Sequence, residues 1–169
     1  MLFRSDLALK HEDPLVAGAA VESPHFKPEH MDLALRGSGA GAAVRSPYFK
    51  PEHMDLALRG AADGAYAAIH SPYFKPEHMD LALKHENPRV AEAAIKSPHF
   101  KPEHMDLALR GSGAGAAVRS PYFKPEHMDL ALRGEGAWAA IHSPYFKPEQ
   151  MDLALRDRKS TRLNSSHRT

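Results

Sequence analysis

Five histidines recur at one place in a repeated motif, and imidazoles at regular spacing could supply the ligands of a metal ion. Each follows Pro-Glu, and Gln150 replaces a sixth; the five are His30, His53, His78, His104 and His127. Stacked helices lie about 8–10 Å apart, whereas each ligand of a zinc ion reaches it at about 2.0 Å. Histidines of successive repeats therefore cannot easily share an ion. We expect them to be solvent-exposed flanking residues and expect no metal site.

Glu29 and Asp32 lie three residues apart and could be a pair of carboxylates for acid–base catalysis, but the same pair occurs in every repeat. Catalysis needs one site whose surroundings drive two pKa values apart, and identical surface pairs supply no such asymmetry. The glycines of "GSGAG" follow no strand and indicate a turn instead of a phosphate-binding loop. The sequence therefore predicts no catalytic residue, no cofactor and no enzyme.

Aromatic and basic residues stand together in the triplet Tyr-Phe-Lys, which suggests single-stranded RNA binding. One aromatic ring per repeat could stack on one base. The candidate contacts are Tyr48, Lys50, Tyr73, Lys75, Tyr122, Lys124, Tyr145 and Lys147. Because the same repeats hold as many acidic residues, we consider nucleic acid the less favoured partner.

These residues belong to a tandem repeat. Its units begin at the Ser-Pro pairs of Ser23, Ser46, Ser71, Ser97, Ser120 and Ser143, at spacings of 23, 25, 26, 23 and 23 residues. Residues 23–60 and 97–134 are identical over 38 positions. A fixed period of this length indicates a solenoid, so we divide the chain into a partial or capping repeat (1–22) and tandem repeats (23–156).

Each repeat contains two short helical segments. In the first, Pro28 favours a helix start, Met31, Ala34 and Leu35 form one apolar stripe, and Gly37 ends the helix. The second is clearest at 87–98; in the shorter repeats its glycines predict a distorted or 3₁₀-like turn. Helices this short need stacking to be stable. The predicted large core residues are Phe26, Phe49, Phe74, Phe100, Phe123 and Phe146.

The stretch "NPRVAEAAIKSPHFKPEHMDLAL", residues 87–109, resembles the leucine-rich repeat variant family, whose HEAT-like units alternate an α-helix with a 3₁₀-helix. The resemblance covers nearly all of residues 6–156. Lys27 and Lys50 depart from it, because they stand where the family typically has a Thr-like helix cap. The resemblance implies an all-α, right-handed α-solenoid of about six units that binds a partner without catalysis.

Positions at which near-identical repeats differ point to a partner surface. Three residues before the Val or Ile of the second segment stand Gly18, Gly41, Tyr66, Glu92, Gly115 and Trp138. A position with such varied residues is unlike a core position, so we expect Tyr66 and Trp138 to be exposed. They either anchor a partner or cover a groove that the glycines leave.

A leucine of the first segment lies about 200° around the helix from the methionine of its repeat, outside the apolar stripe. It either packs on a neighbouring repeat, which we favour slightly, or forms an apolar ridge that contacts a partner. These residues are Leu33, Leu56, Leu81, Leu107, Leu130 and Leu153.

The last thirteen residues, 157–169, break the repeat and resemble a translated sequencing adapter over 157–167. We interpret them as a non-native, disordered tail, so that the protein's own sequence is cut at Arg156. The chain has 22 Lys and Arg against 21 Asp and Glu; the tail holds four of the former and one of the latter, which leaves 18 against 20. This near-neutral balance gives no electrostatic signature of nucleic-acid or membrane binding.

The chain has no cysteine, which fits a reducing compartment, and no apolar run long enough to span a bilayer. We therefore expect a cytoplasmic binding scaffold with a protein partner and no membrane association. The two alternatives are single-stranded RNA binding through the Tyr-Phe-Lys triplets and a structural spacer in a larger protein.

Overall fold

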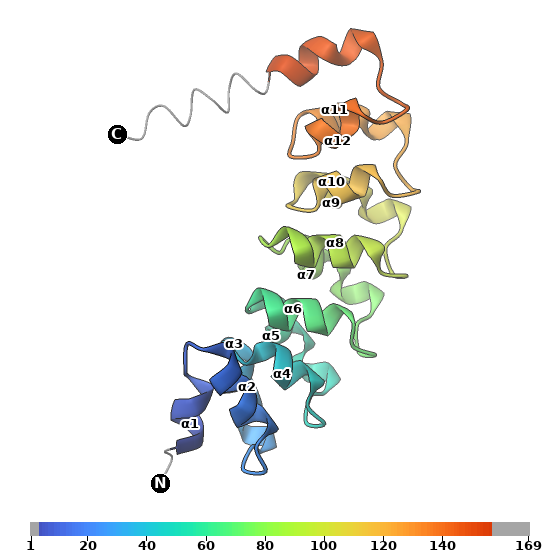
Figure 1. Ribbon diagram of the computed structural model, residues 1–169. Coiled ribbons are helices and arrows are strands. Elements are labelled where there is room, and N and C mark those ends of the chain that lie inside the picture. The colour runs from blue at the N-terminus through green and yellow to red at the C-terminus, as the bar shows by residue number, and fades with distance from the viewer. Residues whose placement is uncertain (1–3, 157–169) are drawn as a thin grey trace, which may run out of the picture.

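The computed structural model describes residues 4–156, and these residues form an all-helical solenoid (Figure 1). The predicted fold class, an all-α stack of short two-helix repeats, is confirmed. The sequence-based interpretation of 157–169 as a disordered tail concerns residues outside the described part. We number the repeats that begin at Ser23, Ser46, Ser71, Ser97, Ser120 and Ser143 as units 1 to 6.

The helices lie in two layers, because each unit contributes one helix to each. The first layer consists of α1 (Arg4–Leu9), α3 (Met31–Arg36), α5 (Met54–Arg59), α7 (Met79–Leu83), α9 (Met105–Arg110) and α11 (Met128–Leu132). Residues 151–156 continue it as a further helix. The second layer consists of α2 (Pro14–Glu22), α4 (Ala40–Arg45), α6 (Ala62–Ile69), α8 (Pro88–Lys96), α10 (Ala114–Val118) and α12 (Ala137–Ile141). Every extensive helix–helix contact joins helices of the same unit or of adjacent units.

A 3₁₀ turn precedes each first-layer helix from α3 onward. These turns are η1 (Pro28–His30), η2 (Pro51–His53), η3 (Pro76–His78), η4 (Pro102–His104), η5 (Pro125–His127) and η6 (Pro148–Gln150). In the short units the glycine-rich start of the second segment forms the predicted turn, closed by a bond from Ala40 N–H to the Gly37 carbonyl at 3.2 Å, and the remainder is the α-helix α4 or α10. Gly37 and Gly39 precede α4 and only Gly41 lies inside it, so the helix contains one glycine instead of three.

The core is a continuous column between the layers. In unit 2, Met54, Ala57 and Leu58 of α5 are buried, and the same three positions are buried in the units on either side. The predicted phenylalanines Phe26, Phe49, Phe74, Phe100 and Phe123 are buried, and Phe146 of the last unit is half-buried. Each unit therefore completes its core only against its neighbours.

Glycines after the first-layer helices allow adjacent units to approach closely. A Cβ on Gly60 would lie 2.9 Å from the carbonyl oxygen of Leu35, near the end of the first-layer helix of the preceding unit. Gly37 and Gly111 show the same approach, at 2.9 Å from Leu9 and 2.8 Å from Leu83. No described glycine has a positive φ, so glycine is needed here for space and not for its dihedral freedom.

We expect Gly60→Ala to lower the free energy of unfolding by about 1–2 kcal/mol, because the backbone of both units must separate to admit the methyl group. Gly115→Ala is the matched control: a Cβ at this position inside α10 meets nothing within 4 Å. This change should stabilise the protein by about 0.5–1 kcal/mol through helix propensity. Urea denaturation of both variants measures the two effects, and equal midpoints would contradict the close approach.

The units differ in length before the Val or Ile of the second layer, and the additional residues of units 2 and 3 lengthen the second-layer helix: α6 has 8 and α8 has 9 residues, whereas α4 has 6 and α10 has 5. The loop after α7 is held by His85: its Nδ1 accepts from Asn87 N–H at 3.0 Å, and its Nε2 lies 3.2 Å from the carbonyl oxygen of Gly60 in the preceding unit. In the short loop of unit 4, the Ser112 hydroxyl donates to the His85 carbonyl at 2.8 Å. Hydrogen bonds between adjacent units are therefore kept although the units differ in length.

The last described helix exposes the face that other first-layer helices bury. Met151 is 43% exposed and Leu155 51% exposed, whereas Met128 and Leu132, their counterparts one unit earlier, are both 0% exposed. This face is apolar because it has the sequence of a stacked unit.

Candidate functional site

The second layer carries a pair of residues four positions apart that changes from unit to unit. Along the chain the pairs are Gly18–Glu22, Gly41–Arg45, Tyr66–His70, Glu92–Lys96, Gly115–Arg119 and Trp138–His142. The second member of every pair is exposed. Because residues four apart lie on one face of a helix, these pairs form one row along the stack.

Tyr66 and Trp138 are exposed, as predicted, at 41% and 60%. Each ring packs on the histidine of its pair with centroids 4.5 Å apart. His70 Nδ1 lies 2.8 Å from the Tyr66 carbonyl oxygen, and His142 Nδ1 lies 2.7 Å from that of Trp138. A carbonyl oxygen only accepts, so Nδ1 carries the proton and the imidazole is fixed in place beneath the larger ring. The two aromatic side chains are therefore preorganised at the surface.

A turn at each Ser-Pro pair leads out of the second layer. The serine hydroxyl accepts from the backbone N–H two residues later, as in Ser71 from Tyr73 at 3.3 Å. The backbone N–H of the following phenylalanine donates to the serine carbonyl, as in Phe74 to Ser71 at 3.2 Å. The same two bonds recur in all six units. The turns after α6 and α8 project to the same side of the stack (Figure 1).

Five pockets lie between consecutive units on this side, and their linings are equivalent. Each is lined by the Val or Ile near the end of one unit together with the serine, the phenylalanine and the second-layer helix of the next unit. In unit order they contain Val21, Val44, Ile69, Ile95 and Val118. Each Ser-Pro turn between them borders two pockets, so the five form a row. We call this surface, the five pockets and the turns that separate them, the Ser-Pro groove.

The pockets have volumes of about 370 to 560 Å³, within the range of natural ligand pockets. Buried Val, Ile and Phe side chains form their apolar floor, and exposed Arg, Lys and His side chains form the rim. Tyr66 lines two pockets and Trp138 lines one. This arrangement can bind an extended chain that places an apolar group in each pocket and a polar group at each rim.

The leucines outside the main stripe are half-buried and pack against the core. They are Leu33, Leu56, Leu81, Leu107, Leu130 and Leu153. None of them lines one of the five pockets. Their packing fits the role that we favour from the sequence, and the contact with a partner stays a prediction.

The tyrosines and the lysines of the Tyr-Phe-Lys triplets lie at different places on the stack. Tyr48, Tyr73, Tyr122 and Tyr145 line the Ser-Pro groove. Each packs at 6.1 to 6.2 Å on the phenylalanine of the preceding unit, which occupies one side of its ring. The lysines Lys50, Lys75, Lys124 and Lys147 line none of the five pockets. The tyrosines line the groove and the lysines do not, and single-stranded RNA binding through the triplets stays the less favoured prediction.

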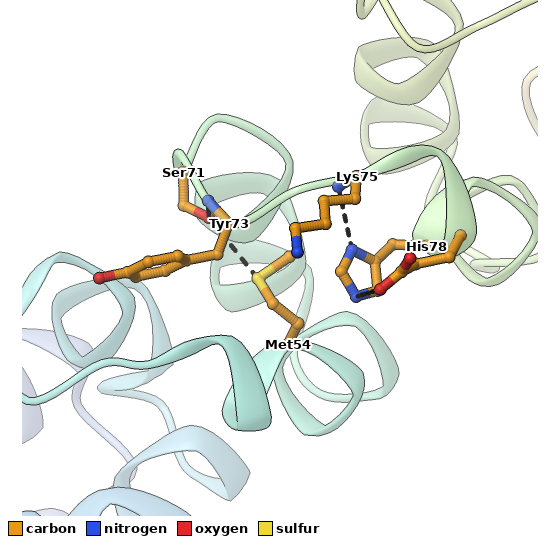
Figure 2. A network of polar contacts seen from close by, with 6 residues as sticks. Met54, Ser71, Tyr73, Lys75 and His78 are labelled. Carbon is orange, nitrogen blue, oxygen red and sulfur yellow. Dashed lines mark hydrogen bonds and ion pairs between the residues drawn. The ribbon is translucent and has the colours of Figure 1, made fainter.

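The recurrent histidines cap the 3₁₀ turns, so the expectation that they are solvent-exposed flanking residues is wrong. His78 is 9% exposed, and its Nδ1 accepts from Lys75 N–H at 3.0 Å (Figure 2). The other four histidines make the same bond at 2.9 to 3.0 Å. Gln150 replaces the imidazole with its own acceptor, since its Oε1 receives Lys147 N–H at 2.9 Å. A side-chain acceptor at the third position of the turn thus binds the backbone N–H of the N-cap residue, which is one half of a capping box; the other half, which a Thr-like cap would supply, is absent because lysine has no acceptor.

The first position of each 3₁₀ turn is proline, and the preceding lysine makes no side-chain cap bond. The pattern Lys-Pro-Glu-His therefore predicts this cap. The replacement of His by Gln in unit 6 shows that the side chain must supply a hydrogen-bond acceptor. Each histidine also packs on a phenylalanine, as His78 does on Phe74 at 5.9 Å.

Within residues 4–156, no group of three or more His, Asp and Glu side chains is arranged to hold a metal ion. The Glu29 and Asp32 positions are exposed in every unit and lie outside the five pockets. In the same part of the chain, no helix has the length and apolarity needed to cross a membrane.

Comparison of the chain with protein families, with curated proteins and with solved structures finds no match. The class that the fold defines is a helical repeat protein, with a row of pockets between its units. The resemblance to the leucine-rich repeat variant family stays a prediction.

Proposed function

We propose that the protein is a non-catalytic scaffold that binds a partner protein in the Ser-Pro groove. The observation that supports this function is the repetition of one pocket between consecutive units, five times in line. A single buried cleft fits a small substrate, whereas a row of equivalent open pockets fits a polypeptide that runs along the stack.

Tyr66 and Trp138 are the anchors of this interaction. Tryptophan and tyrosine contribute a large share of binding energy in interfaces, and both side chains here are fixed by their histidines before a partner arrives. Their replacement by glycine in units 1 and 4 makes the groove uneven, so a partner is bound in one register.

The test uses peptides selected from a random display library on the immobilised chain. Trp138 is the only tryptophan, so a peptide that occupies the groove near it changes the intrinsic fluorescence of the protein. We expect Trp138→Ala to weaken binding of such peptides at least tenfold, in line with about 2 kcal/mol for an interface anchor. Because the side chain is 60% exposed, the free energy of unfolding should change by less than about 0.5 kcal/mol.

Leu7→Ala is the control, because Leu7 is 69% exposed and lines none of the five pockets. It should leave peptide affinity unchanged. A large loss of stability in Trp138→Ala would mean that the ring holds the fold, and failure to select any peptide that perturbs Trp138 would refute the proposed function.

A further inference from the structure

The rim of the Ser-Pro groove is cationic, and this inference on its occupant rests on the proposed function. The position that follows the Val or Ile of each unit is exposed and faces the pockets. From units 1 to 5 it holds Arg45, His70, Lys96, Arg119 and His142, and the partial repeat before them holds Glu22. Arg89 adds a cation, which lies over the Tyr66 ring at 5.5 Å from its centroid.

Only two carboxylates line the five pockets, Glu22 and Glu92. Glu92 is already paired, since Lys96 Nζ donates to its Oε1 at 2.6 Å. The hydrogen bond from Lys96, the charge of Lys96 and the charge of Arg119 hold the pKa of Glu92 below its usual value. The five pockets are thus lined by four Arg and Lys side chains, Arg45, Arg89, Lys96 and Arg119, against the two carboxylates of Glu22 and Glu92, so positive charge is in excess within the groove.

The remaining acids are concentrated elsewhere. Each unit has a glutamate and an aspartate at the positions of Glu29 and Asp32, and these are exposed on the 3₁₀ turn and the first-layer helix. Residues 1–156 are slightly acidic as a whole, with 18 Lys and Arg against 20 Asp and Glu. The cationic rim is therefore a local feature of the groove and not a property of the whole surface.

The distance between adjacent units determines how many residues of a bound peptide separate those that meet equivalent rim positions. Packed helices of adjacent units lie about 8–10 Å apart. An extended or polyproline II chain advances about 3.1–3.3 Å per residue, and polyproline II has three residues per turn. A peptide along the groove therefore passes one unit in about three residues and presents the same side to every rim.

We propose that the Ser-Pro groove binds an extended acidic peptide segment whose carboxylates recur at every third residue. The carboxylates pair with Arg45, Arg89, Lys96 and Arg119, and the residues between them fill the apolar floors. Single-stranded RNA is also a polyanion, but it is the poorer fit because the tyrosines already pack on phenylalanines and the triplet lysines lie outside the groove.

The test uses two synthetic peptides of five triplets, Glu-Pro-Pro and Gln-Pro-Pro, with blocked termini. Binding to the full chain is measured by titration calorimetry and by Trp138 fluorescence at low and at physiological salt. We expect the Glu peptide to bind at least tenfold more tightly than the Gln peptide and to lose that advantage as salt rises.

Two charge-reversal variants locate the effect. Arg45→Glu with Arg119→Glu changes two rim residues, and Arg59→Glu with Arg133→Glu makes the same charge change at exposed residues that line none of the five pockets. Only the first pair should reduce binding of the Glu peptide at least tenfold. Equal losses in both variants would overturn the proposal, because they would mean that net charge alone attracts the peptide.

Three further outcomes separate this inference from the proposed function. If library peptides perturb Trp138 but the Glu and Gln peptides bind equally, the acidic ligand is wrong and the binding function stands. If oligouridylate binds more tightly than the Glu peptide and loses affinity in Arg45→Glu with Arg119→Glu, the occupant is RNA. If no peptide perturbs Trp138, both proposals are overturned.

Discussion

Replacing Met128 with Gln should lower the free energy of unfolding by about 3–4 kcal/mol, whereas the same change at Met151 should cost less than about 1 kcal/mol. Both residues open a first-layer helix with the sequence Met-Asp-Leu-Ala-Leu-Arg. Met128 is 0% exposed and Met151 is 43% exposed, because a following unit covers only the former. Chemical denaturation followed by circular dichroism measures the two losses.

This comparison isolates stacking from helix sequence, since the two helices are identical in sequence and differ in what covers them. Equal losses would mean that the apolar face at Met151 is covered in solution. Sedimentation of both variants at several concentrations then shows whether a second molecule covers it.

His78→Ala should destabilise the protein by about 2–3 kcal/mol, whereas His78→Gln should cost less than about 1 kcal/mol. Alanine removes the acceptor of the Lys75 N–H and the ring that packs on Phe74. Glutamine keeps an acceptor, as Gln150 does in unit 6. Denaturation gives the stability, and hydrogen exchange of the Lys75 amide reports on the bond itself.

Faster exchange at Lys75 in His78→Ala but not in His78→Gln would establish the cap. Equal exchange in the two variants would show that packing on Phe74, and not the hydrogen bond, accounts for the role of His78.

The sequence was sufficient to predict the helical stack and its core. Apolar residues at helical spacing with proline and glycine at the helix ends define each element locally, and a period of 23 to 26 residues requires stacking. The exposure of Tyr66 and Trp138 was also predictable, because near-identical units tolerate glycine, glutamate and aromatic residues at that position.

The caps and the groove were harder to predict, for different reasons. The role of His78 depends on which ring nitrogen accepts a backbone N–H, and a histidine also suggests a metal ligand or a surface residue. The groove arises only between units: the floor residue Val44 and the rim residue His70 belong to different units and meet only through stacking. Stacking geometry also decides that Leu33 packs against the core, which helical spacing alone leaves open.

Within residues 4–156, every extensive helix–helix contact stays within a unit or joins adjacent units, so no extensive contact braces the stack along its length. Its resistance to bending therefore comes from the interfaces between consecutive units, and the compliances of these interfaces add along the stack. A partner bound across several pockets would restrain the motion of neighbouring units relative to one another. Under the proposed function, binding should therefore lower the elastic compliance of the molecule, and single-molecule stretching would measure how many units the partner spans.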